Sequence, residues 1–279
     1  MLPTFELLDR FELLFPTKSK LADLRRSYTD KDLSSILRLV TDKNKEDLRK
    51  LIMEDNTWKL WPLLSEQIDT QFVAAFKSFF VNNTEIWNDC FSRGQLQSKL
   101  WLVHELKKCN VDLGTVFLCA GWYATLATMI FESDIKVDKI RSFDIDETCW
   151  KIAEIFNKPW VINDWQFKAS TKDIFDINFT SETYTTHRSD GTVCEQDDIP
   201  DTIINTSCEH IENFSEWYSK MPIGKLVILQ SNDYFEVKEH VNCSKSISQF
   251  SRSCPMKETL FEGELFLPDY TRFMKIGYK

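Results

Sequence analysis

The segment TVFLCAGWY, residues 115–123, predicts a buried strand that ends in a tight turn. After a helix-length gap, the segment IRSFDID, residues 140–146, predicts a second strand with an acidic tip. A small-residue turn lets a ligand approach the backbone at a helix N-terminus, and an acidic side chain beyond the next strand can hold a ribose diol. Together the two segments predict a nucleoside-binding half-site.

The spacing and glycine content of this half-site favour a nucleoside over a dinucleotide. Asp144 lies 23 positions after Gly121, close to the roughly 20 residues that separate glycine turn and acidic residue in dinucleotide sites. The turn has one glycine, so a pyrophosphate would find little open backbone. S-adenosylmethionine has no phosphates and needs one close backbone approach, which Ala120 and Gly121 can supply. In an alternative interpretation, these small residues only let a helix pack tightly on the sheet.

Further strand-like segments indicate the fold class. Apolar runs at 165–168, 201–206 and 224–230 alternate with helical stretches, which indicates a parallel sheet covered by helices. Segments 259–267 and 271–278 are strand-rich, and the short joint between them demands an antiparallel pair. The expected fold is therefore α/β, with a Rossmann-like, mostly parallel seven-stranded sheet and an antiparallel C-terminal hairpin. The polar stretch 180–200 is expected to be an exposed loop.

From about residue 95 to the C-terminus, the chain resembles the class I S-adenosylmethionine-dependent methyltransferases, a Rossmann-like superfamily. The resemblance rests on the glycine-containing loop after the first strand and on the acidic tip of the second. It also rests on DTIINTSCEHI, residues 201–211, which looks like the family's Asp-x-Val/Ile segment ending in Glu-His-Ile/Leu. The resemblance implies an S-adenosylmethionine-dependent methyltransferase.

The resemblance also implies where the cofactor binds. The glycine loop would lie under the methionine part, Asp144 would hold the ribose hydroxyls, and the loop after the third strand would flank the adenine. The bulky Trp122 and Tyr123 depart from the family pattern, and their rings would either wall the methionine tail or pack in the core. The implied cofactor-binding residues are Cys119, Ala120, Gly121, Trp122, Asp144, Ile145, Ser170, Thr171 and Asn205.

Glu209 and His210 are the predicted catalytic residues. The sulfonium methyl is already electrophilic, so alignment in a dry pocket, with proton removal where the acceptor needs it, can suffice. Histidine suits proton transfer because its ordinary pKa lies near neutrality. His210 is the candidate base, and Glu209 is its neighbour or a substrate anchor. Alternatively, Glu209 binds a backbone amide and His210 caps a helix that begins near Asn213.

No metal site is expected in the same segment. The small-RNA 2'-O-methyltransferases use a Glu-x-x-Glu-His-His metal cluster, whereas here Thr206 replaces the first glutamate and Ile211 the second histidine. The Asp/Asn-Pro-Pro-aromatic motif of amino-directed DNA methyltransferases is also missing, because residues 205–208 are NTSC. The eight cysteines show no paired short spacing suited to zinc, so they are expected to be reduced packing residues.

Polar groups after the fifth strand are candidate acceptor contacts, because open parallel sheets bind ligands at the carboxyl ends of their strands. Aromatic and amide side chains suit a planar or polar acceptor, so a small or nucleotide-like molecule is the expected substrate. A cofactor-binding protein that has lost methyl transfer and acts through a partner is an alternative. The candidate acceptor contacts are Asn232, Tyr234, His240 and Asn242.

Residues 1–93 are expected to form a helical extension ahead of a methyltransferase-like domain at residues 94–279. Residues 17–50 carry ten basic and six acidic side chains, so RNA or DNA methylation with this basic arm is a second alternative. The net charge of −9 opposes nonspecific affinity for nucleic acid. The start of the chain lacks a signal-peptide pattern and no apolar run approaches about 18 residues. A cytoplasmic location without membrane contact is expected.

Overall fold

The computed structural model describes residues 90, 93–188 and 190–279. The expected helical extension at residues 1–93, with its basic arm, lies almost entirely outside the described residues and stays a prediction. The sheet belongs to the compact unit Trp101–Lys279. Among the described residues, no helix combines the length and apolar character needed to cross a membrane.

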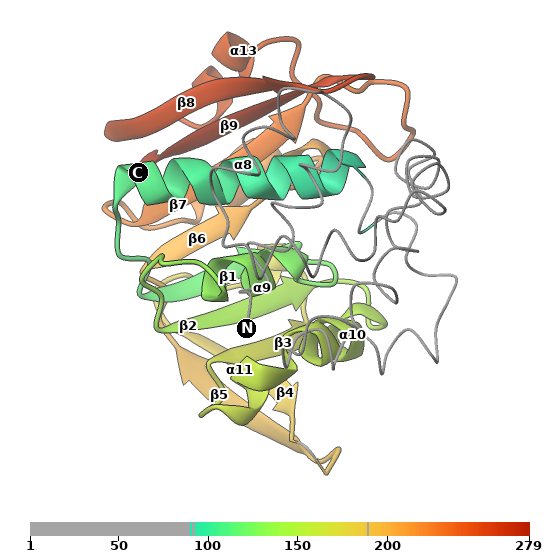
Figure 1. Ribbon diagram of the computed structural model, residues 1–279, viewed down its shortest axis with the longest axis vertical. Helices are drawn as coiled ribbons and strands as arrows, with labels where there is room; N and C mark the ends of the chain where they lie inside the picture. Colours follow the sequence, from blue (N-terminus) through green and yellow to red (C-terminus); the bar gives the residue numbers. More distant parts are fainter. Residues whose placement is uncertain (1–89, 91–92, 189) are drawn as a thin grey trace, which may run out of the picture. The chain divides into compact units, whose positions relative to one another are not determined.

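The seven-stranded sheet has the order β3-β2-β1-β6-β7-β9-β8 (Figure 1). Its first five strands in the chain are mutually parallel, and β9 runs antiparallel between β7 and β8. The predicted mostly parallel sheet with an antiparallel C-terminal hairpin is therefore confirmed. The strands are β1 (Thr115–Cys119), β2 (Lys139–Asp144), β3 (Phe167–Thr171), β6 (Thr202–Asn205), β7 (Leu226–Asn232), β8 (Glu258–Phe266) and β9 (Thr271–Tyr278).

The central strands are apolar along their whole length because both of their faces are covered. All five residues of β1 and all seven residues of β7 are buried. Strands buried on both faces lose the alternation of polar and apolar residues. This explains why short continuous apolar runs predicted them.

Helices separate the parallel strands. α10 packs against β2 and β3, and α13 packs against β8 and β9. α9 and α10 cross in front of the sheet in the view of Figure 1. The helices are α8 (Arg93–Cys109), α9 (Thr125–Phe131), α10 (Cys149–Phe156), α11 (Lys158–Ile162), α12 (Phe214–Ser219) and α13 (Ile247–Ser253), with short 3-10 helices η2 (Ile174–Asp176) and η3 (Cys208–His210).

One face of the sheet packs on a continuous aromatic core. Phe117 of β1 meets Phe143 of β2 edge to face, with ring centroids 5.1 Å apart. Trp217 of α12 and Phe273 of β9 belong to the same buried cluster. Fully burying side chains of this size contributes roughly 1.5–3 kcal/mol each, so this cluster anchors α12 and the strand edges near the site.

The prediction of an exposed loop at residues 180–200 is wrong. The stretch forms a separate antiparallel hairpin of β4 (Glu182–His187) and β5 (Val193–Asp198). β4 alternates buried and exposed residues, which is the pattern of a ribbon with one wet face. Its buried Tyr184 meets Phe143 edge to face at 5.3 Å, so the hairpin covers the core of the sheet. The polar composition did not indicate the hairpin, because threonine is common both in loops and on the solvent-exposed faces of strands.

The third strand starts two residues later than the predicted run 165–168. Asp164 and Trp165 have φ values of 51° and 52°. Left-handed residues turn the chain and cannot continue an extended strand. The strand therefore begins at Phe167 and continues to Thr171, which moves Ser170 and Thr171 from the expected loop to the strand end.

Candidate functional site

The candidate site is defined by the strand order of the parallel sheet. The chain runs from β1 outward to β2 and β3, then returns to β6 and β7 on the other side of β1. In register, Leu118 lies opposite both Ser142 and Ile204, so the carboxyl ends of β1, β2 and β6 meet at one edge. Ligands of open α/β sheets bind outside the carboxyl ends at such a reversal. The loops after β1 and β6 are therefore the structural candidates for ligand binding.

The loop after β1 has an unusual backbone. Ala120, Trp122 and Ala124 all have positive φ values of 51°, 49° and 50°. A left-handed conformation costs an L-residue roughly 1–2 kcal/mol, and such strain clusters at functional sites. The Trp122 ring stacks on Tyr123, with ring centroids 4.5 Å apart. Alanine and tryptophan residues thus adopt a left-handed conformation in this loop that glycine would adopt without this cost.

Gly121 supports the loop through packing. Its φ is not among the positive values, but an added Cβ would lie 2.1 Å from Ser142 Oγ and 3.1 Å from Leu118 Cγ. Its backbone N–H donates to the Phe143 carbonyl at 3.0 Å. The absence of a side chain therefore lets the loop itself lie directly on β2, whereas the packing interpretation expected a helix to pack on the sheet.

Asp144 links the acidic tip of β2 to the loop after β1. Trp122 N–H donates to Asp144 Oδ2 at 2.7 Å, and Asp146 N–H donates to Oδ1 at 3.1 Å. Burial raises the pKa of the half-buried Asp144 carboxyl, while these backbone hydrogen bonds act in the opposite direction. Each carboxylate oxygen has two lone pairs, so the group keeps capacity to accept ligand hydroxyls.

The other predicted cofactor residues divide into exposed and buried sets. Ile145 is 70% exposed beside Asp144, and Thr171 is exposed at the end of β3. An exposed isoleucine at this place offers an apolar face to a planar ring. Cys119, Ser170 and Asn205 are buried at the ends of their strands. Among the described residues, Ser170 Oγ and Asn205 Nδ2 are buried without a hydrogen-bond partner.

Glu209 lies on the loop after β6, where η3 carries it into the protein. The side chain is buried, and its Oε1 accepts from Arg272 Nη1 at 2.6 Å and from Asn232 Nδ2 at 2.8 Å. Arg272 also donates through Nη2 to the Thr206 carbonyl at 2.6 Å. The glutamate thus binds side chains from β7 and β9, in contrast to the suggested backbone amide.

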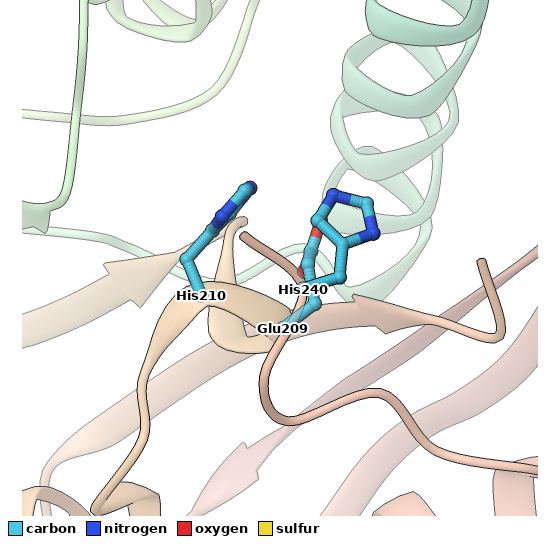
Figure 2. A group of neighbouring side chains, drawn as sticks. All are labelled: Glu209, His210 and His240. Carbon is cyan, nitrogen blue, oxygen red and sulfur yellow. The ribbon is translucent and has the colours of Figure 1, made fainter. Parts of the chain in front are cut away.

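His210 and His240 come together from different loops. His210 is exposed on η3, His240 lies on the loop after β7, and their ring centroids are 4.6 Å apart at an angle of 83°. Figure 2 shows both rings and the Glu209 carboxylate on the same side of η3. α12 begins at Phe214 with no side-chain cap, so His210 does not cap that helix. The structure therefore places His240, a predicted acceptor contact, next to the predicted catalytic residues Glu209 and His210.

Asn242 holds the loop after β7 against η3. Its backbone N–H donates to the Glu209 carbonyl at 2.8 Å, and its Nδ2 donates to the Cys208 carbonyl at 3.0 Å. Tyr234 lies nearby and stacks on Tyr270, with ring centroids 5.3 Å apart. Asn232 and Asn242 thus have structural partners, whereas the Tyr234 ring lies at the edge of the group with half-buried surface.

Arg272 is the residue of this group that sequence reasoning missed. It lies on β9, buried at 4% exposure, inside the apolar strand TRFMKIGY. A charged residue within a buried strand requires a buried partner, because an isolated buried charge is expensive. That signal was present in the sequence, but it did not say which carboxylate is the partner.

A cavity of about 360 Å³ lies at the opposite edge of the sheet. It is lined by the end of α8 and the segment before β2, including Leu106, Asn110 and Lys136. None of the predicted site residues lines it, so it does not alter the position of the candidate site.

No protein-family model matches the chain, and no curated protein matches it. Solved structures with similar folds include magnesium protoporphyrin IX methyltransferase from Synechocystis PCC 6803 with bound S-adenosylmethionine. That structure has a TM-score of 0.45 and 12% identity, covering 78% of this chain and 96% of that one. The N-methyltransferase NodS from Bradyrhizobium japonicum WM9 has a TM-score of 0.45 and 8% identity, covering 66% and 97%. The [4+2]-cyclase SpnF has a TM-score of 0.47 and 10% identity, covering 64% and 80%.

The sheet order and its antiparallel β9 define the fold as a Rossmann-like α/β fold with the strand arrangement of the class I methyltransferase type. This assignment rests on the strand order and register themselves. A fold of this kind hosts many activities, so the function has to be argued from the site.

Proposed function

We propose that this chain binds S-adenosylmethionine over the ends of β1 and β2 and transfers its methyl group to a small or nucleotide-like acceptor. The observation that carries the proposal is the Asp144 carboxylate, hydrogen-bonded to the strained loop at the point where the strand order reverses. A carboxylate in this position suits the two hydroxyls of a ribose. The adjacent loop has no phosphate cradle, which suits a nucleoside without phosphates.

Each cofactor residue has a proposed part. Cys119 to Trp122 would lie along the methionine portion, and Asp144 would accept from the ribose hydroxyls. The exposed Ile145 would cover one face of the adenine, with Ser170 and Thr171 at its edge. Asn205, at the end of β6, has a buried Nδ2 without a partner in the described part of the chain and would donate to the cofactor from the other side of β1.

His210 is proposed as the base for acceptors that must lose a proton. Its Nδ1 lies 3.1 Å from the Glu239 carbonyl, which can only accept, so in the neutral ring Nδ1 carries the hydrogen and Nε2 keeps a lone pair. The acceptor O–H or N–H would lose its proton to Nε2 as its heavy atom bonds the methyl carbon. The C–S bond breaks and its electron pair stays on sulfur, giving S-adenosylhomocysteine. Glu209 is a positioning residue in this scheme, because it holds η3 through Arg272 and Asn232.

The first test is calorimetric titration of the full chain with S-adenosylmethionine. Wild type should bind, Asp144→Ala should bind at least about tenfold more weakly because ribose hydrogen bonds to a charged group are lost, and the exposed Glu147→Ala should match wild type. No binding by folded wild-type protein would refute the proposal. Equal affinities of all three proteins would remove Asp144 from the site.

Methyl transfer is tested separately from binding. S-adenosylhomocysteine release should be measured with panels of hydroxylated small molecules, nucleosides and short RNA or DNA. His210→Ala should keep cofactor binding and lose transfer. Turnover with RNA or DNA alone would favour the nucleic-acid alternative, and cofactor binding without turnover on any panel would favour the noncatalytic one.

A further inference from the structure

Glu209, His210 and His240 form a compact group of potential metal ligands. One ligand atom from each residue lies within 4.8 Å of the corresponding atoms of the other two. Two residues come from η3 after β6 and the third comes from the loop after β7 (Figure 2). Two imidazoles and a carboxylate are a donor set that suits zinc and other divalent transition metals.

Both histidines are oriented as metal-binding histidines are. His210 Nδ1 lies 3.1 Å from the Glu239 carbonyl, and His240 Nδ1 lies 2.8 Å from the Tyr234 carbonyl. A carbonyl only accepts hydrogen bonds, so in the neutral ring each Nδ1 carries the hydrogen and each Nε2 presents a lone pair. Histidines that bind metals donate their other ring N–H to a carbonyl or carboxylate in this way. The rings meet edge to face, so neither is stacked flat against the other.

The two carboxylate oxygens of Glu209 have different surroundings in the described part of the chain. Its Oε1 accepts from Arg272 and Asn232, whereas Oε2 is buried without a hydrogen-bond partner among the described residues. A buried oxygen without a partner costs free energy, and the cost is higher for a charged group. Carboxylates that bind metals are themselves held by hydrogen bonds, which here come through Oε1. Glu209 is therefore a fixed ligand with one open oxygen.

We propose that Glu209, His210 and His240 bind one divalent transition-metal ion, with its remaining coordination positions open to oxygen ligands. In the metal-bound protein Nε2 of His210 is a ligand, so the base role proposed above applies to the metal-free protein. Ligands at about 2.0–2.2 Å from a tetrahedral ion lie roughly 3.4 Å from each other. The ligand atoms lie within 4.8 Å of one another, so the group must contract by up to about 1.4 Å. The exposed His210 side chain can make this adjustment. The buried Glu209 anchors the ion from below, and the open positions face solvent beside the histidines.

This group of ligands cannot be recognised from neighbouring positions in the chain. Thr206 and Ile211 lack ligand groups where a Glu-x-x-Glu-His-His cluster has them. The fold supplies the second imidazole from His240, which is held beside η3 by the contacts of Asn242 with the main chain of Cys208 and Glu209.

The test is metal titration of the full chain after removal of metal by a chelator. Co²⁺ binding is followed by visible absorption and Mn²⁺ binding by calorimetry, with no cofactor present. Wild type should bind one ion per chain. Loss of a residue that only orients a ligand costs roughly 10- to 100-fold in affinity, so His210→Ala and His240→Ala should each lose more than about 100-fold. His104→Ala is the matched control, because His104 is exposed on α8.

The proposal is overturned if folded wild type binds neither ion, if the two histidine variants bind as wild type does, or if the Co²⁺ spectrum shows thiolate ligands. Far-UV circular dichroism checks that each variant is folded. The result is separable from the proposed function, because S-adenosylmethionine is titrated into the same proteins afterwards. Metal binding without cofactor binding would refute only the proposed function, and cofactor binding without metal binding would refute only the metal site.

Discussion

Replacing Arg272 by methionine should strongly destabilise the protein, because it leaves the Glu209 carboxylate buried without its cation. The side chains of both residues are 5% exposed or less, and Arg272 Nη1 donates to Glu209 Oε1 at 2.6 Å. Removing one partner of a buried ion pair costs about 3–5 kcal/mol. For a domain of 150–250 residues, each kcal/mol shifts Tm by about 2–4 °C, so Arg272→Met should lower Tm by roughly 6–20 °C.

The assay is thermal and urea unfolding followed by far-UV circular dichroism, in the presence of a chelator so that metal binding does not contribute. Arg252→Met is the matched control, since Arg252 is exposed on α13, and it should change stability by less than about 0.5 kcal/mol. The double variant Glu209→Gln/Arg272→Met should recover much of the loss, because it no longer buries an unpaired charge. A loss for Arg272→Met within about 1 kcal/mol of the control would refute the reasoning and show that solvent reaches Glu209.

Three further predictions concern the loop, the acidic tip and the hairpin. Gly121→Ala should lower the free energy of unfolding in urea by about 1–3 kcal/mol, because its Cβ would meet Ser142 Oγ at 2.1 Å. The double variant Gly121→Ala/Ser142→Ala should recover part of this loss, and no recovery would contradict the contact. Burial raises the pKa of Asp144. As pH decreases, the affinity for S-adenosylmethionine measured by calorimetry should therefore begin to fall at a higher pH than it would with an ordinary aspartate. An affinity that does not change with pH would argue against a role of ionised Asp144 in binding. Burial alone would raise the pKa of Asp198, but hydrogen bonds led by that of Lys139 outweigh it and lower the pKa. The stability from Asp198 is therefore complete above the ordinary aspartate pKa and lost as pH falls through the lowered value, and Asp198→Asn should flatten that part of a stability-versus-pH curve.

The fold was predictable because its strands carry local signals. The central strands β1, β6 and β7 are short apolar runs, and the short joint between β8 and β9 leaves only an antiparallel pairing. The β4–β5 hairpin was not predictable in this way. Its strand faces alternate between core and water, so its polar residues have the composition of a loop.

The position of Asp144 after β2 was also readable from the sequence, because strand and acidic tip are contiguous. Close packing at Gly121 was one of two open interpretations, but its partner was not readable, because Ser142 Oγ lies on the neighbouring strand. The left-handed backbone at Ala120 and Trp122 was equally hidden, since neither residue type signals a positive φ.

The sequence by itself thus determined the order along the chain of the strands of the seven-stranded sheet, the acidic tip and the Glu209-His210 pair. Only the tertiary structure decided which side chains surround that pair. Arg272 reaches Glu209 from 63 positions away, and His240 reaches His210 from another loop. Parallel strands place their carboxyl ends at one edge, and the antiparallel β9 brings its first residues to the same edge, with Arg272 opposite Asn232. Such contacts depend on strand order and register, so they leave no local pattern.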